Sequence, residues 1–159
     1  LYDADGKRIT APNTQGRIFV ASTLSFGGYS GGGNKEVVDG MLSSGDVGHF
    51  DADGRLFVDG RDDDMIVSGG ENVFPVEIEN LLVEHAKIND AAVIGVPDED
   101  FGQRLKAFVV PEKGHVVTED EVKAYVKANL ARYKVPRDVV FIDELPRNPT
   151  GKVLRNKLS

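Results

Sequence analysis

The sequence contains no cysteine and few histidines, and both shortages restrict its chemistry. Without cysteine, disulfide bonds and thiolate metal sites are excluded, and a reducing compartment is compatible with the composition. The three histidines, His49, His85 and His115, are far apart and lack the short spacing of zinc ligands, so we expect no metal site. No apolar run reaches the roughly 18 residues of a membrane-spanning helix, so we expect a cytoplasmic protein without a transmembrane segment.

Positive charge is also scarce. The 159 residues include 19 lysines and arginines against 26 aspartates and glutamates, which gives a formal net charge of −7. This balance argues against general nucleic-acid binding, and we expect no nucleic-acid partner. Residues 132–159 are the exception, because they carry seven basic and three acidic side chains. Such a segment is either a solvated face or a site for a phosphorylated ligand.

The remaining composition is that of a globular protein, with 40% hydrophobic and 28% charged residues. Short apolar stretches bounded by turn residues predict strands, and one pair of them forms a hairpin around the turn sequence DADG. The predicted strands and hairpin cover residues 16–22, 47–60, 65–70, 90–96, 104–110 and 138–142.

Three helices are predicted as well. Pro75 suits the first turn of a helix, and apolar side chains recur with helical spacing from Ile78 onward. Thr118 and Glu121 form a capping box that begins a second helix. The sequence TGKVLRNKL, from Thr150, predicts a third. Residues 64–159 therefore predict a compact α+β domain in which helices cover a short sheet, preceded by about sixty β-rich residues, too few for a convincing core.

Four short features go beyond what a fold requires. They are Asp46 in SSGDVG, Arg61 before three aspartates, Gly69-Gly70 before Glu71, and Lys152 after the turn Thr150-Gly151. Taken alone, the first, third and fourth are better explained as plain turns or a solvated lysine, and the charge pattern of the second does not distinguish an acidic loop from a hinge. Each also suits a ligand: carboxylates bind ribose hydroxyls, arginine and lysine bind phosphate, and glycine admits close approach to the backbone. The glycine-dense segment 27–33 lacks a following Gly-Lys-Ser/Thr, and we expect a mobile surface loop there.

In this order, the features resemble the motifs of the adenylate-forming superfamily of acyl-CoA synthetases, luciferases and peptide-synthetase adenylation domains. SGD at 44–46 resembles the family's TGD motif, and GRDDDMIVSGGENVFPVEIE at 60–79 resembles GRxDxxIxxxGxxVxPxEIE. PRNPTGKVLR at 146–155 is similar to the closing PxTxxGKxxR motif. The similarity runs from about Gly16 to the end, and GGENVFPVEIE most resembles the fatty and medium-chain acyl-CoA ligases.

The resemblance implies a two-step ligase reaction. A carboxylate and ATP, with Mg²⁺, give an acyl-adenylate and pyrophosphate, and a thiol, usually that of CoA, then takes the acyl group. By the matched motifs, Asp46 and Arg61 would hold the ribose of ATP. Lys152 would be catalytic, contacting carboxylate and phosphate oxygens during adenylation. Asp63 would be the hinge about which a small C-terminal domain rotates between the half-reactions.

The resemblance also implies where the thiol substrate binds. Gly70 and Glu71 would line the pantetheine tunnel, and Phe101 matches an aromatic residue that flanks it in some members. Tyr133 and Arg137 match positions that contact the nucleotide end of CoA in some ligases. The chain departs from other relatives at Val135, where they carry a basic CoA contact.

The family's Ser/Thr/Gly-rich phosphate loop and acyl pocket lie upstream of these motifs and are not in this sequence. The resemblance thus implies that residues 1–62 are the tail of a large N-terminal domain, with a hinge at about 61–64, and that residues 63–159 are the mobile C-terminal domain. We expect a fatty-acid–CoA ligase, with ATP and Mg²⁺ bound mainly by the missing N-terminal domain, and an inactive isolated chain. The alternatives are an adenylation domain that loads a carrier protein and a non-catalytic binding module.

Overall fold

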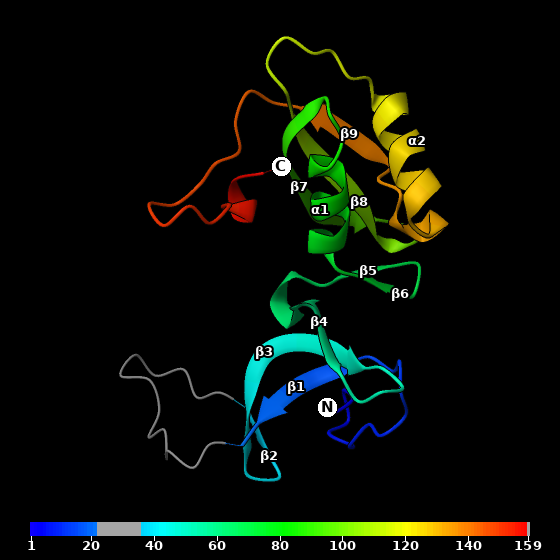
Figure 1. Cartoon of the computed structure of the whole chain (residues 1–159), viewed down its shortest axis with the longest axis vertical. Coiled ribbons are helices and arrows are strands. Elements are labelled where there is room, and N and C mark those ends of the chain that lie inside the picture. Colours follow the sequence, from blue (N-terminus) through cyan, green and yellow to red (C-terminus); the bar gives the residue numbers. More distant parts are fainter. Residues whose placement is uncertain (22–35, 159) are drawn as a thin grey trace. The chain divides into compact units, whose positions relative to one another are not determined.

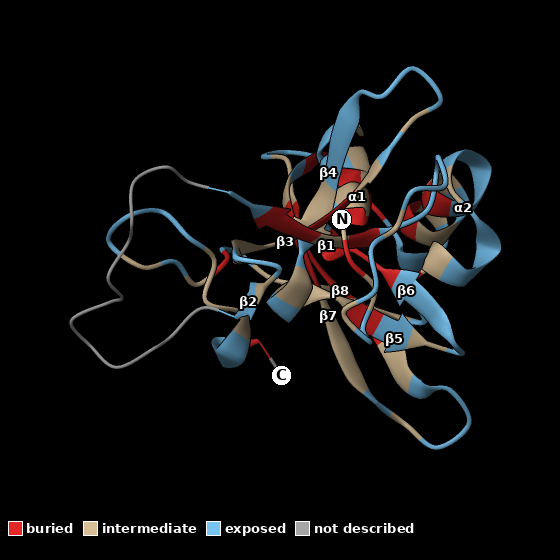
Figure 2. Ribbon diagram, turned by 90° about the horizontal axis from the view of Figure 1, so that it is seen from below, coloured by how far each residue is buried: buried red, intermediate tan, exposed pale blue. Residues whose placement is uncertain are grey.

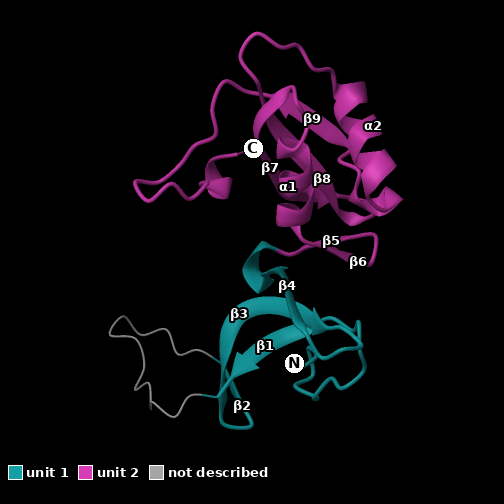
Figure 3. Cartoon of the chain, in the orientation of Figure 1, with its two compact units in different colours: residues 1–64 teal, residues 65–159 magenta. Residues whose placement is uncertain are grey.

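The computed structural model describes residues 1–21 and 36–158, so the predicted glycine-rich surface loop at 27–33 lies outside the described residues. The chain divides into two compact units, Leu1–Asp64 and Met65–Ser159, each with a sheet of its own (Figure 3). No helix of the described segments is long and apolar enough to cross a membrane.

The first unit is an antiparallel sheet built around one long strand. Its elements are β1 (Gly16–Val20), β2 (Val37–Val38), β3 (Met41–Phe50), β4 (Leu56–Arg61) and the 3₁₀ turn η1 (Asp62–Asp64). Strand β3 pairs with each of the other three strands. The predicted hairpin at 47–60 is confirmed, since β3 and β4 pair across the DADG turn, where Gly54 has φ +78°.

The core of the first unit is small. It is formed by Tyr2, Ile18, Phe19 and Val47, which are all at least nine-tenths buried. Three consecutive apolar side chains of β4, Leu56, Phe57 and Val58, are by contrast 45–63% exposed (Figure 2). The described residues of this unit, 1–21 and 36–64, therefore bury little apolar surface.

The second unit contains a five-stranded sheet organised by a long hairpin. Its strands are β5 (Ile66–Ser68), β6 (Glu71–Val73), β7 (Ile88–Asp98), β8 (Gly102–Pro111) and β9 (Asp138–Phe141). Strand β8 pairs antiparallel with β7 and, at Ser68–Gly102, with β5, and it pairs parallel with β9 (Figure 1). The sequence indicated β5, β7, β8 and β9, but not the three-residue strand β6.

Helices α1 (Pro75–Val83) and α2 (Glu119–Asn129) cover one face of this sheet. Alternate residues of β7, Ala91 and Val93, pack in one cluster with Ile78 and Leu82 of α1 and with α2. The predicted helix start at Pro75 and the Thr118–Glu121 capping box are both confirmed. The α+β architecture is thereby confirmed too.

The capping glutamate of α2 has a second bond. The Lys87 ammonium lies 2.7 Å from Glu121, and this contact, followed by the backbone N–H of Thr118, lowers the pKa of Glu121 from 4.5 to about 2. The start of β7 is therefore tied to the start of α2.

The other face of the β7–β8 hairpin is covered by the end of the chain. Ala92, Phe108 and Val110 pack there against Leu145 and Leu158. The predicted third helix from Thr150 is wrong. Gly151 has φ +87°, residues 147 and 153 form an isolated antiparallel bridge, and the 3₁₀ turn η3 covers only Arg155–Lys157. A hairpin tip thus occupies the place of the first helical turn.

Candidate functional site

The two residues predicted to hold a ribose lie opposite each other in the first unit. Asp46 of β3 pairs with Arg61 of β4 in the strand register, and the Arg61 Nη1 to Asp46 Oδ1 distance is 3.5 Å. Arg61 Nε donates a shorter bond of 3.0 Å to Asp63 Oδ1. The hydrogen bond with Asp63, and then its charge, raise the pKa of Arg61, so the guanidinium remains a cation. Both predicted side chains stay partly exposed and accessible to a ligand.

Gly45 makes this arrangement possible, although it was not among the predicted site residues. Its φ is +84°, and a Cβ there would lie 3.1 Å from both Nη1 and Nη2 of Arg61. A larger residue would therefore be strained and would press on the guanidinium. The available signal was the glycine of the SGD sequence itself.

The predicted hinge residue, Asp63, lies in η1, directly before the boundary at Asp64 and Met65. Its carboxylate accepts the bond from Arg61 and is 68% exposed. The aspartates on either side of it are half-buried, so the triplet is less solvated than its charge alone suggested.

The glycine turn of the second unit joins β5 and β6. Gly69 and Gly70 have φ +61° and +84°, which lie in the left-handed region that favours glycine. The Gly69 N–H donates to the Phe101 carbonyl at 3.0 Å, and a Cβ on Gly69 would lie only 2.8 Å from Phe101 Cδ1. Nothing lies within 4 Å of a Cβ built on Gly70. Position 69 is therefore closely packed, and position 70 is open.

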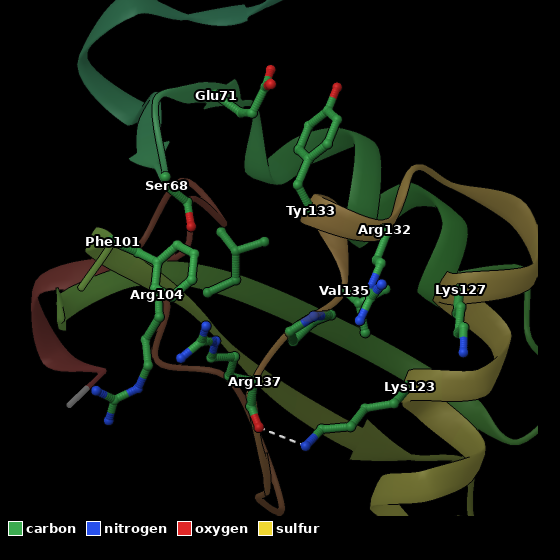
Figure 4. Close-up of a pocket in the computed structure, with 13 residues that line it drawn as sticks. Ser68, Glu71, Phe101, Arg104, Lys123, Lys127, Arg132, Tyr133, Val135 and Arg137 are labelled. Atoms are coloured by element: carbon green, nitrogen blue, oxygen red, sulfur yellow. Dashed lines mark hydrogen bonds between the residues drawn. The ribbon is translucent and has the colours of Figure 1, made fainter. Parts of the chain in front are cut away.

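A pocket of about 820 Å³ opens beside this turn (Figure 4). Four residues predicted to contact CoA or its pantetheine arm line it together: Glu71, Phe101, Tyr133 and Arg137. Gly70 is not part of this lining, whereas Gly69 is. Val135 and Pro136 form an apolar part of the wall. The structure thus gathers residues from β6, the β7–β8 turn and the segment after α2.

Five of the lining side chains are cationic and only one is acidic. The cations are Arg104, Lys123, Lys127, Arg132 and Arg137, and the acid is Glu71. Of these cations only Arg137 was predicted from the sequence as a site residue. The excess of basic residues in segment 132–159 was the signal for Arg132, and no sequence signal pointed to the two lysines of α2.

Some of these cations are already neutralised. Arg104 Nε bonds Asp138 at 2.8 Å, and Arg137 lies 3.7 Å from Asp98 with its guanidinium 4.2 Å from the centre of the Phe101 ring. Burial alone would raise the pKa of Asp98, but backbone N–H bonds from Phe101 and Asp100 and the nearby arginines outweigh it and lower that pKa. Asp98 is therefore a carboxylate that holds this side of the pocket.

The side of α2 carries one paired cation and two others. The paired one is Lys123, which bonds Glu119 at 2.6 Å and the Arg137 carbonyl at 2.5 Å. Within residues 1–21 and 36–158, neither Lys127 nor Arg132 has an ion-pair partner. Figure 4 shows both on the side of α2, apart from Phe101 and Arg104. These two side chains can neutralise an anionic ligand without breaking an existing pair.

Lys152 belongs to a different feature, a tight hairpin of residues 146–154. The Leu154 N–H donates to the Pro146 carbonyl at 2.7 Å, and Asn148 N–H donates to the Lys152 carbonyl at 2.9 Å. Lys152 is exposed, as predicted, and it is not among the residues that line the basic pocket. The domain therefore carries two separate polar features.

Asn148 organises the tip of this hairpin and was missed from sequence. Its Oδ1 accepts bonds from the Thr150 N–H at 3.0 Å, the Thr150 hydroxyl at 2.8 Å and the Lys152 N–H at 2.8 Å. Asn-Pro is a turn-initiating pair, which was the available signal. The backbone at Lys152 is thus held in place while its side chain remains free to meet a ligand.

The pattern of residues in the second unit matches a known family. Residues 77–152 match the sequence profile of the AMP-binding enzyme C-terminal domain. The chain belongs to the adenylate-forming superfamily. An adenylate-forming relative, the indoleacetate–CoA ligase of Aromatoleum aromaticum, is 48% identical over 118 residues, which are 74% of this chain and 23% of that protein.

Solved structures of related enzymes are also similar to this chain. The o-succinylbenzoate CoA synthetase of Bacillus subtilis, in complex with its acyl-adenylate intermediate, has a TM-score of 0.87 and 35% identity over 99% of this chain and 33% of that one. A fatty acyl CoA synthetase of Mycobacterium tuberculosis has a TM-score of 0.62 and 43% identity over 77% of this chain and 24% of its own. The chain spans about a quarter to a third of the length of these relatives.

Proposed function

We propose that this chain is the C-terminal part of an ATP-dependent acyl-CoA ligase, which converts a carboxylate to an acyl-adenylate and then to a CoA thioester. One observation carries the proposal: a single domain of the matching family holds an exposed lysine on an ordered hairpin and, separately, a basic pocket beside a glycine turn. Two such features suit two half-reactions that use different faces of one mobile domain.

In this proposal, residues 1–62 are the tail of a large N-terminal domain that binds most of the ATP and its Mg²⁺. Asp46 and Arg61 hold the ribose hydroxyls, for which their partly exposed carboxylate and guanidinium are suited. Asp63 is the hinge of the rotating domain, residues 63–159. Its bond to Arg61 makes the ribose site and the hinge neighbours in the first unit.

Lys152 stabilises the adenylation step in this proposal. The negative charge on the carboxylate and phosphate oxygens is met by a cation whose backbone is already fixed by Asn148. A preorganised charge of this kind lowers the barrier without reorganisation during the reaction.

The basic pocket receives CoA in this proposal. Gly69 and Phe101 of its lining, next to the open position Gly70, admit the pantetheine arm, and Lys127 and Arg132 meet phosphates at the nucleotide end. These two cations, which have no ion-pair partner among the described residues, favour CoA over a carrier-protein acceptor, since free CoA carries three phosphate groups and a carrier's arm only one. Val135 forms an apolar part of the wall at the position where some relatives have a basic residue that contacts CoA. Arg132, three residues earlier, lines the same pocket and supplies a cation there.

The carboxylate is an organic acid whose pocket lies in the part of the protein outside this sequence. Similar ligases act on aromatic acids, and the mycobacterial fatty acyl CoA synthetase is the support for a fatty acid. We propose a fatty acid as the first substrate to test, with indoleacetate and succinylbenzoate beside it in one panel.

The test uses the full-length protein that contains this chain. Lys152→Ala is expected to reduce acyl-adenylate formation, measured by pyrophosphate release, by about 100-fold, because a transition-state charge is lost. Transfer from preformed acyl-AMP to CoA should stay within about two-fold of wild type. Lys113→Ala, an exposed lysine of the same unit, is the matched control and should change neither step.

Three outcomes would contradict the proposal. Equal loss of both half-reactions would make Lys152 structural. Transfer of the acyl group to a carrier protein but not to CoA would show that the carrier protein, and not CoA, is the acceptor. A wild-type full-length protein that forms no acyl-adenylate from any acid in the panel would favour a non-catalytic binding module.

A further inference from the structure

The Lys152 hairpin is attached to the sheet through both of its arms. Leu145 and Leu158 bury its base in the cluster behind β7 and β8. Two arginines, Arg147 before the tip and Arg155 after it, extend from the hairpin to carboxylates on β7 and α1. The hairpin is therefore attached by polar bonds as well as by apolar burial.

Arg147 joins the tip of the hairpin to β7. Its Nη1 donates to the Gly151 carbonyl at 2.6 Å, and its Nη2 donates to Asp90 Oδ2 at 2.6 Å. The other oxygen of Asp90 accepts the Ala91 N–H at 3.0 Å, which orients the carboxylate. One guanidinium thus spans from the strand to the residue directly before Lys152.

Arg155 fixes the second arm. Its two terminal nitrogens donate to the two oxygens of Glu79, at 2.6 and 3.1 Å, in the forked geometry that arginine favours. Glu79 is only 14% exposed, and its Oε1 also accepts the Val93 N–H at 2.7 Å. The arm three residues after Lys152 is therefore bonded to a half-buried carboxylate on α1.

We propose that the pairs Arg147–Asp90 and Arg155–Glu79 are positioning devices that fix the direction of Lys152 for adenylation. The inference rests on the proposed role of Lys152 and extends it to four residues that contact no substrate. Burial of Leu145 and Leu158 holds the base of the hairpin, and Val153 packs partly against the same cluster. The tip itself is exposed, and Arg147 bonds its Gly151 carbonyl to Asp90 of the sheet. A displacement of about 1 Å at a reacting group can cost on the order of 100-fold in rate.

The test changes Asp90, because its pair with Arg147 is partly exposed and its loss should leave the domain folded. In the full-length protein, Asp90→Asn is expected to lower kcat for acyl-adenylate formation by about 10-fold. Transfer from preformed acyl-AMP to CoA should be unchanged. Asp90→Glu keeps the carboxylate and should recover most of the lost rate. Lys87→Gln, which breaks the partly exposed pair with Glu121 three residues before Asp90, is the matched control and should change neither step.

Amide hydrogen exchange gives a second readout that needs no activity. In Asp90→Asn, the Asn148, Lys152 and Leu154 amides, which are bonded within the hairpin, should exchange faster, while those of α1 and β8 keep their wild-type rates.

An unchanged adenylation rate in Asp90→Asn would overturn the inference. So would equal loss of both half-reactions, or a loss shared with Lys87→Gln, since both indicate a general structural effect. If the wild-type protein forms no acyl-adenylate, the proposed function fails by itself. Hairpin exchange then decides whether the anchors hold Lys152, and unchanged exchange in Asp90→Asn would show that they do not.

Discussion

The two glycines between β5 and β6 should respond differently to the same substitution. Both have positive φ, so alanine at either position should cost about 1–2 kcal/mol of backbone strain. At Gly70 nothing else opposes the new methyl group. At Gly69 the Cβ would lie 2.8 Å from Phe101 Cδ1, about 0.6 Å closer than the 3.4 Å at which ordinary contact begins.

Relief of that contact requires the Phe101 ring to move. The ring also receives the Arg137 guanidinium, 4.2 Å from its centre, an interaction worth about 0.5–1 kcal/mol at an exposed site. We therefore expect Gly69→Ala to destabilise the second unit by roughly 1.5–3 kcal/mol, against about 1–2 kcal/mol for Gly70→Ala. The difference between the two is the cost of moving the ring.

Urea denaturation of the two variants and the wild type, followed by circular dichroism, measures this difference. A Phe101→Leu background provides a check: with no ring to displace, Gly69→Ala should cost no more in that background than Gly70→Ala costs in the wild type. If Gly69→Ala is no more destabilising than Gly70→Ala, the steric reasoning at Phe101 is wrong.

Three further predictions concern other parts of the second unit. The pKa of Glu121 is about 2 in the folded state and 4.5 in the unfolded state, so the folded state binds fewer protons between these values. The free energy of unfolding should therefore fall as the pH drops from about 4.5 to about 2. Glu121→Gln should flatten this part of a plot of unfolding free energy against pH. Leu82→Ala should cost about 2–5 kcal/mol in a denaturation midpoint, because this side chain is fully buried, whereas the exposed Val83→Ala on the same helix should stay within about 0.5 kcal/mol. Lys127→Ala should raise the KM for CoA roughly five-fold and leave adenylation unchanged, and an unchanged KM would remove Lys127 from the CoA site.

Local signals account for the parts of the fold that the sequence predicted. Pro75 begins α1 and the Thr118–Glu121 box begins α2 because both act within one helical turn. Strand β7 was predicted because both of its faces pack against apolar side chains, so its middle is a short continuous apolar stretch. The last predicted helix failed for a related reason: a left-handed Gly151 and the hydrogen bonds of Asn148 overrode the helical pattern that follows them.

Long-range pairs account for what the sequence did not show. Arg147 and Asp90 are 57 residues apart, and Arg155 and Glu79 are 76 apart, so no local pattern connects them. The basic pocket likewise collects cations from β8, α2 and η2 (Arg132–Lys134), and the motifs that suggested a CoA site named only one of them. Which charges remain unpaired is decided by the packing of distant segments.

The final residues of the chain have a consequence for any shortened form of the protein. Arg155 bonds Glu79 of α1, the helix that covers one face of the β7–β8 hairpin, while Leu158 is buried against the opposite face of that hairpin. Deletion of the last five residues would therefore remove one support from each side of a single strand. A proteolytic cut after Leu154 should therefore destabilise the β7–β8 hairpin on both of its faces, although that hairpin is far from the cut in the sequence.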